Sequence, residues 1–90
     1  MARIEVTRMS DEEFRVKVDD GAGVSVHEVS ASADDVQRYG GGAAAEQLIE
    51  ASFHFLLSRE PKESILKRFE LPVIEHYFPE YPRKIRGRLD

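Results

Sequence analysis

Apolar and polar residues alternate in three short stretches near the start of the chain. The alternating apolar positions are Ile4 and Val6, then Phe14, Val16 and Val18, then Val24 and Val26. A period of two predicts three strands. Seven of the eight valines lie at or before Val36, whereas all six leucines lie at or after Leu48. A strand-favouring half therefore precedes a helix-favouring half.

An antiparallel meander can place these valines on one face of a sheet. The first hairpin, turning at residues 10–12, is predicted to pair Ile4 with Val18 and Val6 with Val16. The second, turning at residues 19–23, is predicted to pair Val18 with Val24, Val16 with Val26 and Arg15 with His27. One face is then apolar, and the other carries Glu5, Arg15, Lys17 and His27.

Helix signals follow the predicted strands. Ser32 is a favourable N-cap for a short helix that stops at Gly40, and the glycines 40–42 separate it from a helix over 43–58. That second helix is apolar around most of its circumference, which predicts burial on more than one side. Prolines open two further predicted helices, one with Ile65, Leu66 and Phe69 inward and one from Val73 to Phe78.

These elements predict an α+β fold, a three-stranded antiparallel meander followed by three or four helices packed on one face. Residues 1–82 are predicted to form one domain. Four of the six residues 83–88 are basic and show no periodicity, so residues 83–90 are expected to form a flexible basic tail.

Composition narrows the function classes. The chain has 90 residues and a formal charge of -4, all of which sits in residues 1–45. The sequence contains no cysteine, which excludes disulfides, thiolate zinc sites and a cysteine nucleophile. No signal-like stretch and no apolar run near the roughly 18 residues of a membrane span is present. A soluble, cytoplasmic protein without a membrane partner is the expectation.

The sequence provides little support for catalysis or for a cofactor. The stripe Glu46, Glu50 and His54 could hold a metal on one helix face, but a mostly apolar helix also needs one solvated face. The three glycines could cradle a phosphate, yet they lack the flanking residues of phosphate-binding loops and are interpreted as a connector. We predict no cofactor, no metal and no enzyme activity, with an acid/base role of His54 as the weakest alternative.

Nucleic-acid binding is the main alternative function. Residues 64–78 superficially resemble a helix-turn-helix, but the second helix offers Glu75 and His76 where cationic or amide side chains usually read bases. The tail could contact phosphates through four cations, Arg83, Lys84, Arg86 and Arg88. A pI near 5.4 opposes a dedicated nucleic-acid binder.

The leading hypothesis is a non-enzymatic protein-interaction or regulatory module. The second half holds more apolar surface than a three-stranded sheet can cover, and an exposed apolar patch usually marks a protein interface. A homodimer through an edge strand or through the long helix, or another protein partner, is expected. The candidate contact residues are Glu50, Phe53, His54, Phe55, Leu57, Tyr77, Phe78 and Tyr81.

The segment REPKESILKRFELPVIEHYFPEYP, residues 59–82, is preceded by SFHFLLS. It resembles the closing stretch of a group of small bacterial proteins of unknown function. The resemblance covers roughly the last 45 residues. It implies a self-standing small bacterial protein and assigns no catalytic residues.

Overall fold

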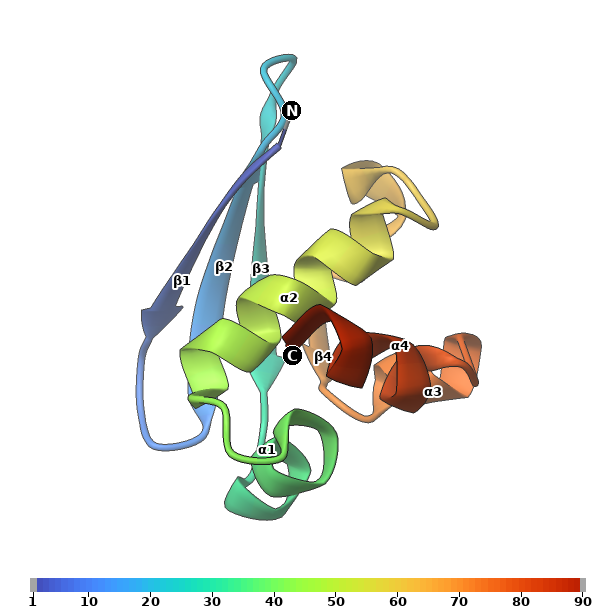
Figure 1. Cartoon of the computed structure of the whole chain (residues 1–90). Helices are drawn as coiled ribbons and strands as arrows, with labels where there is room; N and C mark the ends of the chain where they lie inside the picture. Colours follow the sequence, from blue (N-terminus) through green and yellow to red (C-terminus); the bar gives the residue numbers. More distant parts are fainter. Residues whose placement is uncertain (1, 90) are drawn as a thin grey trace.

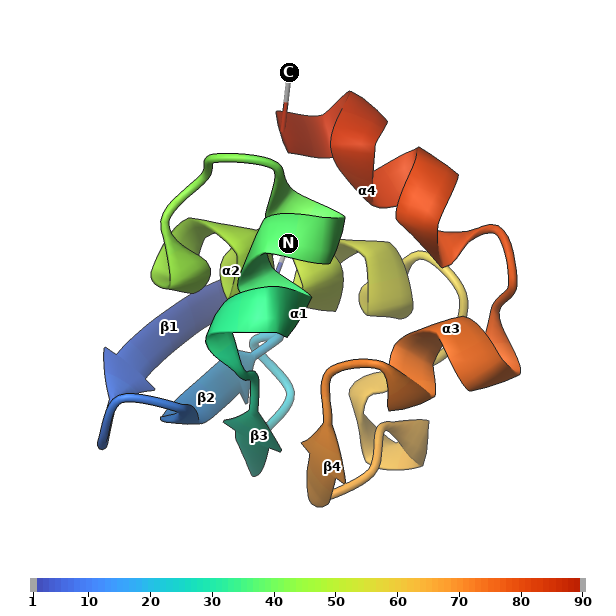
Figure 2. The ribbon, with the colours of Figure 1, turned by 90° about the horizontal axis from the view of Figure 1, so that it is seen from below.

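A four-stranded sheet and one layer of helices make up the fold (Figures 1 and 2). The computed structural model describes residues 2–89. In chain order its elements are β1 (Arg3–Arg8), β2 (Glu13–Asp19), β3 (Val24–Ser30), α1 (Ala33–Gly40), α2 (Ala45–Leu57), the 3-10 turn η1 (Lys62–Ser64), β4 (Arg68–Glu70), α3 (Val73–Tyr77) and α4 (Tyr81–Leu89). The strands β1, β2 and β3 form an antiparallel meander, and β4 runs parallel to β3. The predicted α+β class is confirmed.

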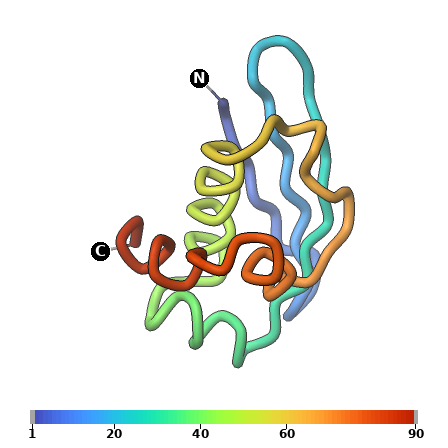
Figure 3. The backbone as a smooth tube through the Cα atoms, turned by 90° about the vertical axis from the view of Figure 1, so that its right-hand side faces the viewer, coloured from blue at the N-terminus to red at the C-terminus, as the bar shows by residue number. Residues whose placement is uncertain are grey.

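The first hairpin has the predicted register. Ile4 pairs with Val18, and Val6 pairs with Val16. Their side chains share the inner face of the sheet, where Val16 and Val18 are fully buried. All four helices lie on this side, so the other face of the sheet has no helical cover (Figure 3).

The second hairpin is shifted by one residue from the predicted register, so that prediction is wrong. Val16 pairs with His27 rather than Val26. The shift turns His27 into the core and leaves Val26 exposed. The turn itself sets the shift, because the Asp20 N–H donates to the Gly23 carbonyl and the Asp20 carboxylate accepts from the N–H groups of Ala22 and Gly23.

The strand β4 replaces the helix predicted after Pro61. Only the single turn η1 is helical there, and the chain then extends so that Phe69 pairs with Val29 of β3. Phe69 is buried as predicted, but in a strand. Three residues are too few to show a period, and this strand forms only because β3 offers a free edge.

The first two helices match the prediction closely. Ser32 caps α1 with a full capping box, in which its hydroxyl accepts from the Asp35 N–H and the Asp35 carboxylate accepts from the Ser32 N–H. Gly41 ends α1 in the left-handed region, with φ of 67°. The next helix, α2, crosses the inner face of the sheet (Figure 1) and buries side chains on several sides.

The structure has a helix where the sequence predicted an irregular tail. Residues 83–89 belong to α4, in which Tyr81 and Ile85 are fully buried. Tyr81 holds the helix start, since its hydroxyl lies 2.6 Å from the Ser52 hydroxyl of α2. No helix within residues 2–89 is long and apolar enough to cross a membrane.

Candidate functional site

An apolar groove lies between the end of α2, β4 and α3. Its volume is about 200 Å³. Most of its lining is apolar, including Leu56, Ile65, Leu66, Phe69, Ile74 and Tyr77. Leu66 and Tyr77 are large apolar side chains that remain 46% and 63% exposed at this groove.

One wall of the groove begins where α2 ends. The Ser58 hydroxyl donates to the Phe55 carbonyl, and the Glu60 N–H donates to the Leu56 carbonyl, which satisfies the last turn of the helix. Pro61 then takes an extended backbone with ψ of 158°. The chain leaves the helix axis here, and the following turn η1 stands beside the sheet instead of continuing α2.

Two side-chain contacts tie the segment 62–66 to the sheet. The buried Lys62 ammonium donates to the Asp20 carboxylate at 2.7 Å, and this bond raises the pKa of Lys62. His27 Nδ1 lies 2.8 Å from the Leu66 carbonyl oxygen. Since a carbonyl only accepts, Nδ1 carries a proton, and in the neutral imidazole Nε2 then accepts from the Ser25 hydroxyl at 2.8 Å.

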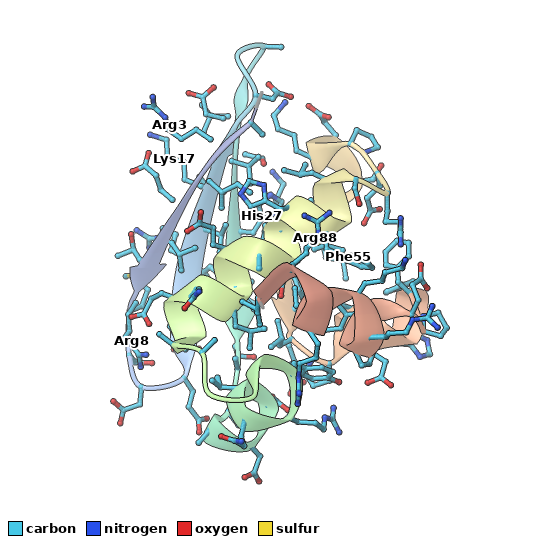
Figure 4. The ribbon with its side chains drawn as sticks, viewed as in Figure 1. Arg3, Arg8, Lys17, His27, Phe55 and Arg88 are labelled. Carbon is cyan, nitrogen blue, oxygen red and sulfur yellow. The ribbon has the colours of Figure 1, made fainter. Side chains whose placement is uncertain are left out.

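His27 is buried and holds the backbone of Leu66 beside the groove. Its ring lies between the sheet and α2 (Figure 4). Its ring packs on Phe53 with centroids 5.3 Å apart. Burial lowers the pKa of His27 because the imidazolium would lose its hydration. The residue was predicted on the polar face of the sheet and instead fixes the backbone of Leu66.

Aromatic contacts support the floor and the far wall. Phe69 packs on Phe53 with ring centroids 6.0 Å apart, and Phe78 meets Phe55 edge-on at 5.8 Å. These contacts join β4 and the end of α3 to α2 across the interior. Packed elements thus stand on both sides of the groove, and the connecting segment 60–66 completes its lining.

Glu60 is the charged group of the groove. Glu60 is one of the lining residues, and partial burial raises the pKa of its carboxyl. None of the ion pairs formed within residues 2–89 includes Glu60. Its neighbour Arg59 instead pairs with Glu80 at 3.2 Å. The groove therefore offers apolar surface next to one negative charge that lacks a cationic partner among the described residues.

The structure separates the predicted contact residues into three groups. Phe53, Phe55 and Tyr81 are buried in the core and cannot meet a partner in this structure, which corrects that part of the prediction. Glu50 and His54 lie 3.8 Å apart on the exposed side of α2, with half-buried Leu57 on the same helix. Tyr77 and Phe78 line the groove.

The four basic candidates of the C-terminal segment also divide. Arg86 donates to the carbonyls of Arg38 and Tyr39 at the end of α1, at 2.9 and 3.0 Å, and so caps that helix. Arg83, Lys84 and Arg88 are exposed on α4. At about 100° per residue, Arg83 points nearly opposite to the buried Ile85, whereas Lys84 and Arg88, four residues apart, share one flank of the helix.

The uncovered face of the sheet forms a charge ladder with little net charge. Cross-strand neighbours oppose Arg3 to Asp19, Glu5 to Lys17 and Glu28 to Arg15 and Arg68. Arg3 and Lys17 point away from the helices (Figure 4). Such neighbours stabilise the sheet modestly and leave no strong field for an anionic partner.

The sequence interpretation missed Glu60, Ile65 and Leu66 as groove residues. Their only signal was an apolar pair next to a carboxylate and a proline, which is common in ordinary loops. No cluster of three or more His, Asp or Glu side chains suited to a metal ion occurs within residues 2–89. Comparison with protein-family models, with curated proteins and with solved structures finds no match.

Proposed function

We propose that this protein is a non-enzymatic interaction module whose groove binds an apolar segment of a protein partner that carries a basic residue. The observation that carries the proposal is the Glu60 carboxylate beside an apolar groove. An apolar side chain of the partner would bury Leu66 and Tyr77, and a neighbouring Lys or Arg would neutralise Glu60.

The charge at Glu60 supports a cationic partner over a neutral one. Partial burial raises the pKa of Glu60, and its carboxylate has no cationic partner within residues 2–89. A Lys or Arg of a ligand would supply that partner, whereas an Asp or Glu would add repulsion. The net charge of -4 also favours encounter with basic segments.

Binding fits this groove better than catalysis does. Among its described lining residues, Glu60 is the only carboxyl, and no imidazole or amine accompanies it. General acid-base chemistry usually needs two groups with separated pKa values around one reacting atom. The nucleic-acid alternative keeps less support, because Arg86 is engaged in capping α1, which leaves three exposed cations on α4 in a chain of net charge -4.

A pair of synthetic peptides tests the proposal. One is an amphipathic helix of Leu and Lys, and the other carries Glu in place of every Lys. We expect fluorescence anisotropy to show tighter binding of the Lys peptide. Equal binding of both peptides, or of neither, contradicts the proposal.

Matched variants locate the binding. Leu66→Ser removes an apolar side chain from the groove, and we expect about tenfold weaker binding of the Lys peptide. Val26→Ser is the control, since Val26 is equally exposed, at 44% against 46%, but lies on the open sheet face.

A second pair of variants tests the charge preference. Glu60→Gln should reduce the preference for the Lys peptide over the Glu peptide about threefold, and Glu13→Gln should not. Equal losses in variant and control place the binding elsewhere.

A further inference from the structure

Along the outer edge of β1, the backbone N–H and C=O groups of every second residue are free. In the β2–β3 ladder the Asp20 N–H donates to Gly23 and the Ala31 N–H donates to Glu12, so even-numbered residues of β2 bond to β3. Odd-numbered residues of β2 then bond to β1, as the bond from the Met9 N–H to Glu13 confirms. Their partners are Arg3, Glu5 and Thr7. The N–H and C=O groups of Ile4 and Val6 therefore point away from the sheet.

The side chains along this edge complement a second copy of the same strand. Ile4 and Val6 are half-buried on the inner face, while Arg3 and Glu5 are exposed on the outer face. If two β1 strands run antiparallel about Ile4, then Ile4 faces Ile4, and Ala2 faces Val6 of the other copy. On the outer face, Arg3 faces Glu5 twice. Apolar side chains extend the core, and opposite charges meet across the seam.

We propose that the β1 edge pairs with the β1 edge of a second copy in this register, forming a continuous antiparallel sheet. The neighbouring registers fit worse. A register centred on Glu5 places two carboxylates opposite each other. One centred on Val6 sets Ile4 against Arg8, whose guanidinium already pairs with Glu46 at 3.0 Å.

The other edge of the sheet offers no comparable surface. The strand β4 has three residues, and charged Arg68 and Glu70 flank its one buried side chain. Short, charged edges resist addition of a further strand. The longer β1 edge, with two half-buried apolar side chains, is the one suited to a two-fold contact.

Light scattering over a dilution series tests the pairing. We expect a dimer at high concentration that dissociates on dilution. Glu5→Arg replaces two attractive contacts by two repulsive ones and should weaken dimerisation about tenfold or more. Glu13→Arg changes the net charge equally on β2 and should leave dimerisation unchanged. A monomer at every concentration, or equal effects of both variants, overturns the proposal.

Cysteine variants test the register independently, even if the charge variant is poorly folded. The chain has no cysteine, so each variant carries one thiol. The two thiols of Ile4→Cys face each other across the two-fold axis, within the Cα separation of about 4.4–6.8 Å that a disulfide needs. Those of Val6→Cys lie about 13 Å apart along the seam. Copper–phenanthroline should cross-link the first variant and not the second, and the reverse outcome overturns the register.

Discussion

The two edges of the sheet differ in how they are made and in what they expose. The strand β1 is six residues long, pairs with its sequence neighbour through a short turn and leaves its outer edge open. The strand β4 is three residues long and pairs in parallel with β3, from which nearly forty residues separate it. Local sequence therefore specifies β1, whereas tertiary contacts specify β4.

The same difference underlies the different roles that we propose for the two edges. At β1 the open groups belong to the backbone, which suits addition of a strand. Beside β4 the backbone of Leu66 is fastened by His27, and what remains open is a side-chain groove with Glu60. Changes that release β4 should therefore abolish the groove and leave the β1–β2 hairpin intact.

The largest effect is expected from Phe69→Ala. Phe69 is buried against Phe53, and removing a buried aromatic ring costs about 3–5 kcal/mol of unfolding free energy. Urea denaturation measures the loss, and hydrogen exchange should show amides of residues 66–71 losing protection first. Val26→Ala, on the exposed face of β3, should cost less than about 0.5 kcal/mol. A similar cost for both variants would mean that β4 is not held by this contact.

A smaller, pH-dependent effect is expected at His27. Because its folded-state pKa lies below the ordinary 6.5, the unfolded state binds more protons below that pH. The stability is therefore fully present above pH 6.5 and is lost as the pH falls through 6.5 toward the lower pKa of the folded state. Urea midpoints across this range measure it.

Two variants test whether His27 causes this pH dependence of stability. His27→Ala should remove it, at a cost of about 1–3 kcal/mol near pH 7.5 for the unpaired Leu66 carbonyl. The exposed His54 provides the control, since His54→Ala should retain the dependence of the wild type. An unchanged pH profile in the His27 variant would show that another group titrates.

The smallest effect is expected from Arg86→Ala. Its guanidinium donates to two carbonyls at the end of α1, in a partly exposed setting, so the loss should be about 1 kcal/mol. Arg83→Ala removes the same charge from the exposed side of α4 and should change the thermal unfolding free energy by less than about 0.5 kcal/mol. If both variants lose the same unfolding free energy, the loss comes from the change in net charge and not from the bonds of Arg86 to α1.

Sequence alone could predict the parts of the molecule that local patterns specify. The β1–β2 register and the Ser32 cap followed from alternation and from capping chemistry. The prediction of the β2–β3 register failed because residues 24–31 carry two alternating sets of apolar residues. The prediction turned Val24 and Val26 inward, whereas the structure buries Val29 and Ala31, which lie on the opposite face. The buried phase includes His27, whose cost of burial is met only by Leu66, a partner distant in sequence.

The groove could not be predicted because it depends on such distant partners. A sequence pattern would place Lys62 at the surface, but its bond to Asp20 allows it to be buried. The helix α4 was missed for the same reason, since Tyr81 and Ile85 find their contacts on helices much earlier in the chain. Apolar content was a correct guide to burial at Phe69 but not to secondary structure.

Backbone amide shifts on addition of the Leu and Lys peptide test the central claim most directly, because they report every residue at once. We predict shifts confined to residues 56–66, β4 and α3, with Leu66 and Tyr77 among the largest, and weaker shifts in Glu60→Gln. Shifts concentrated on β1 or on the open face of the sheet, with residues 64–78 unchanged, would contradict the assignment of the groove as the binding site.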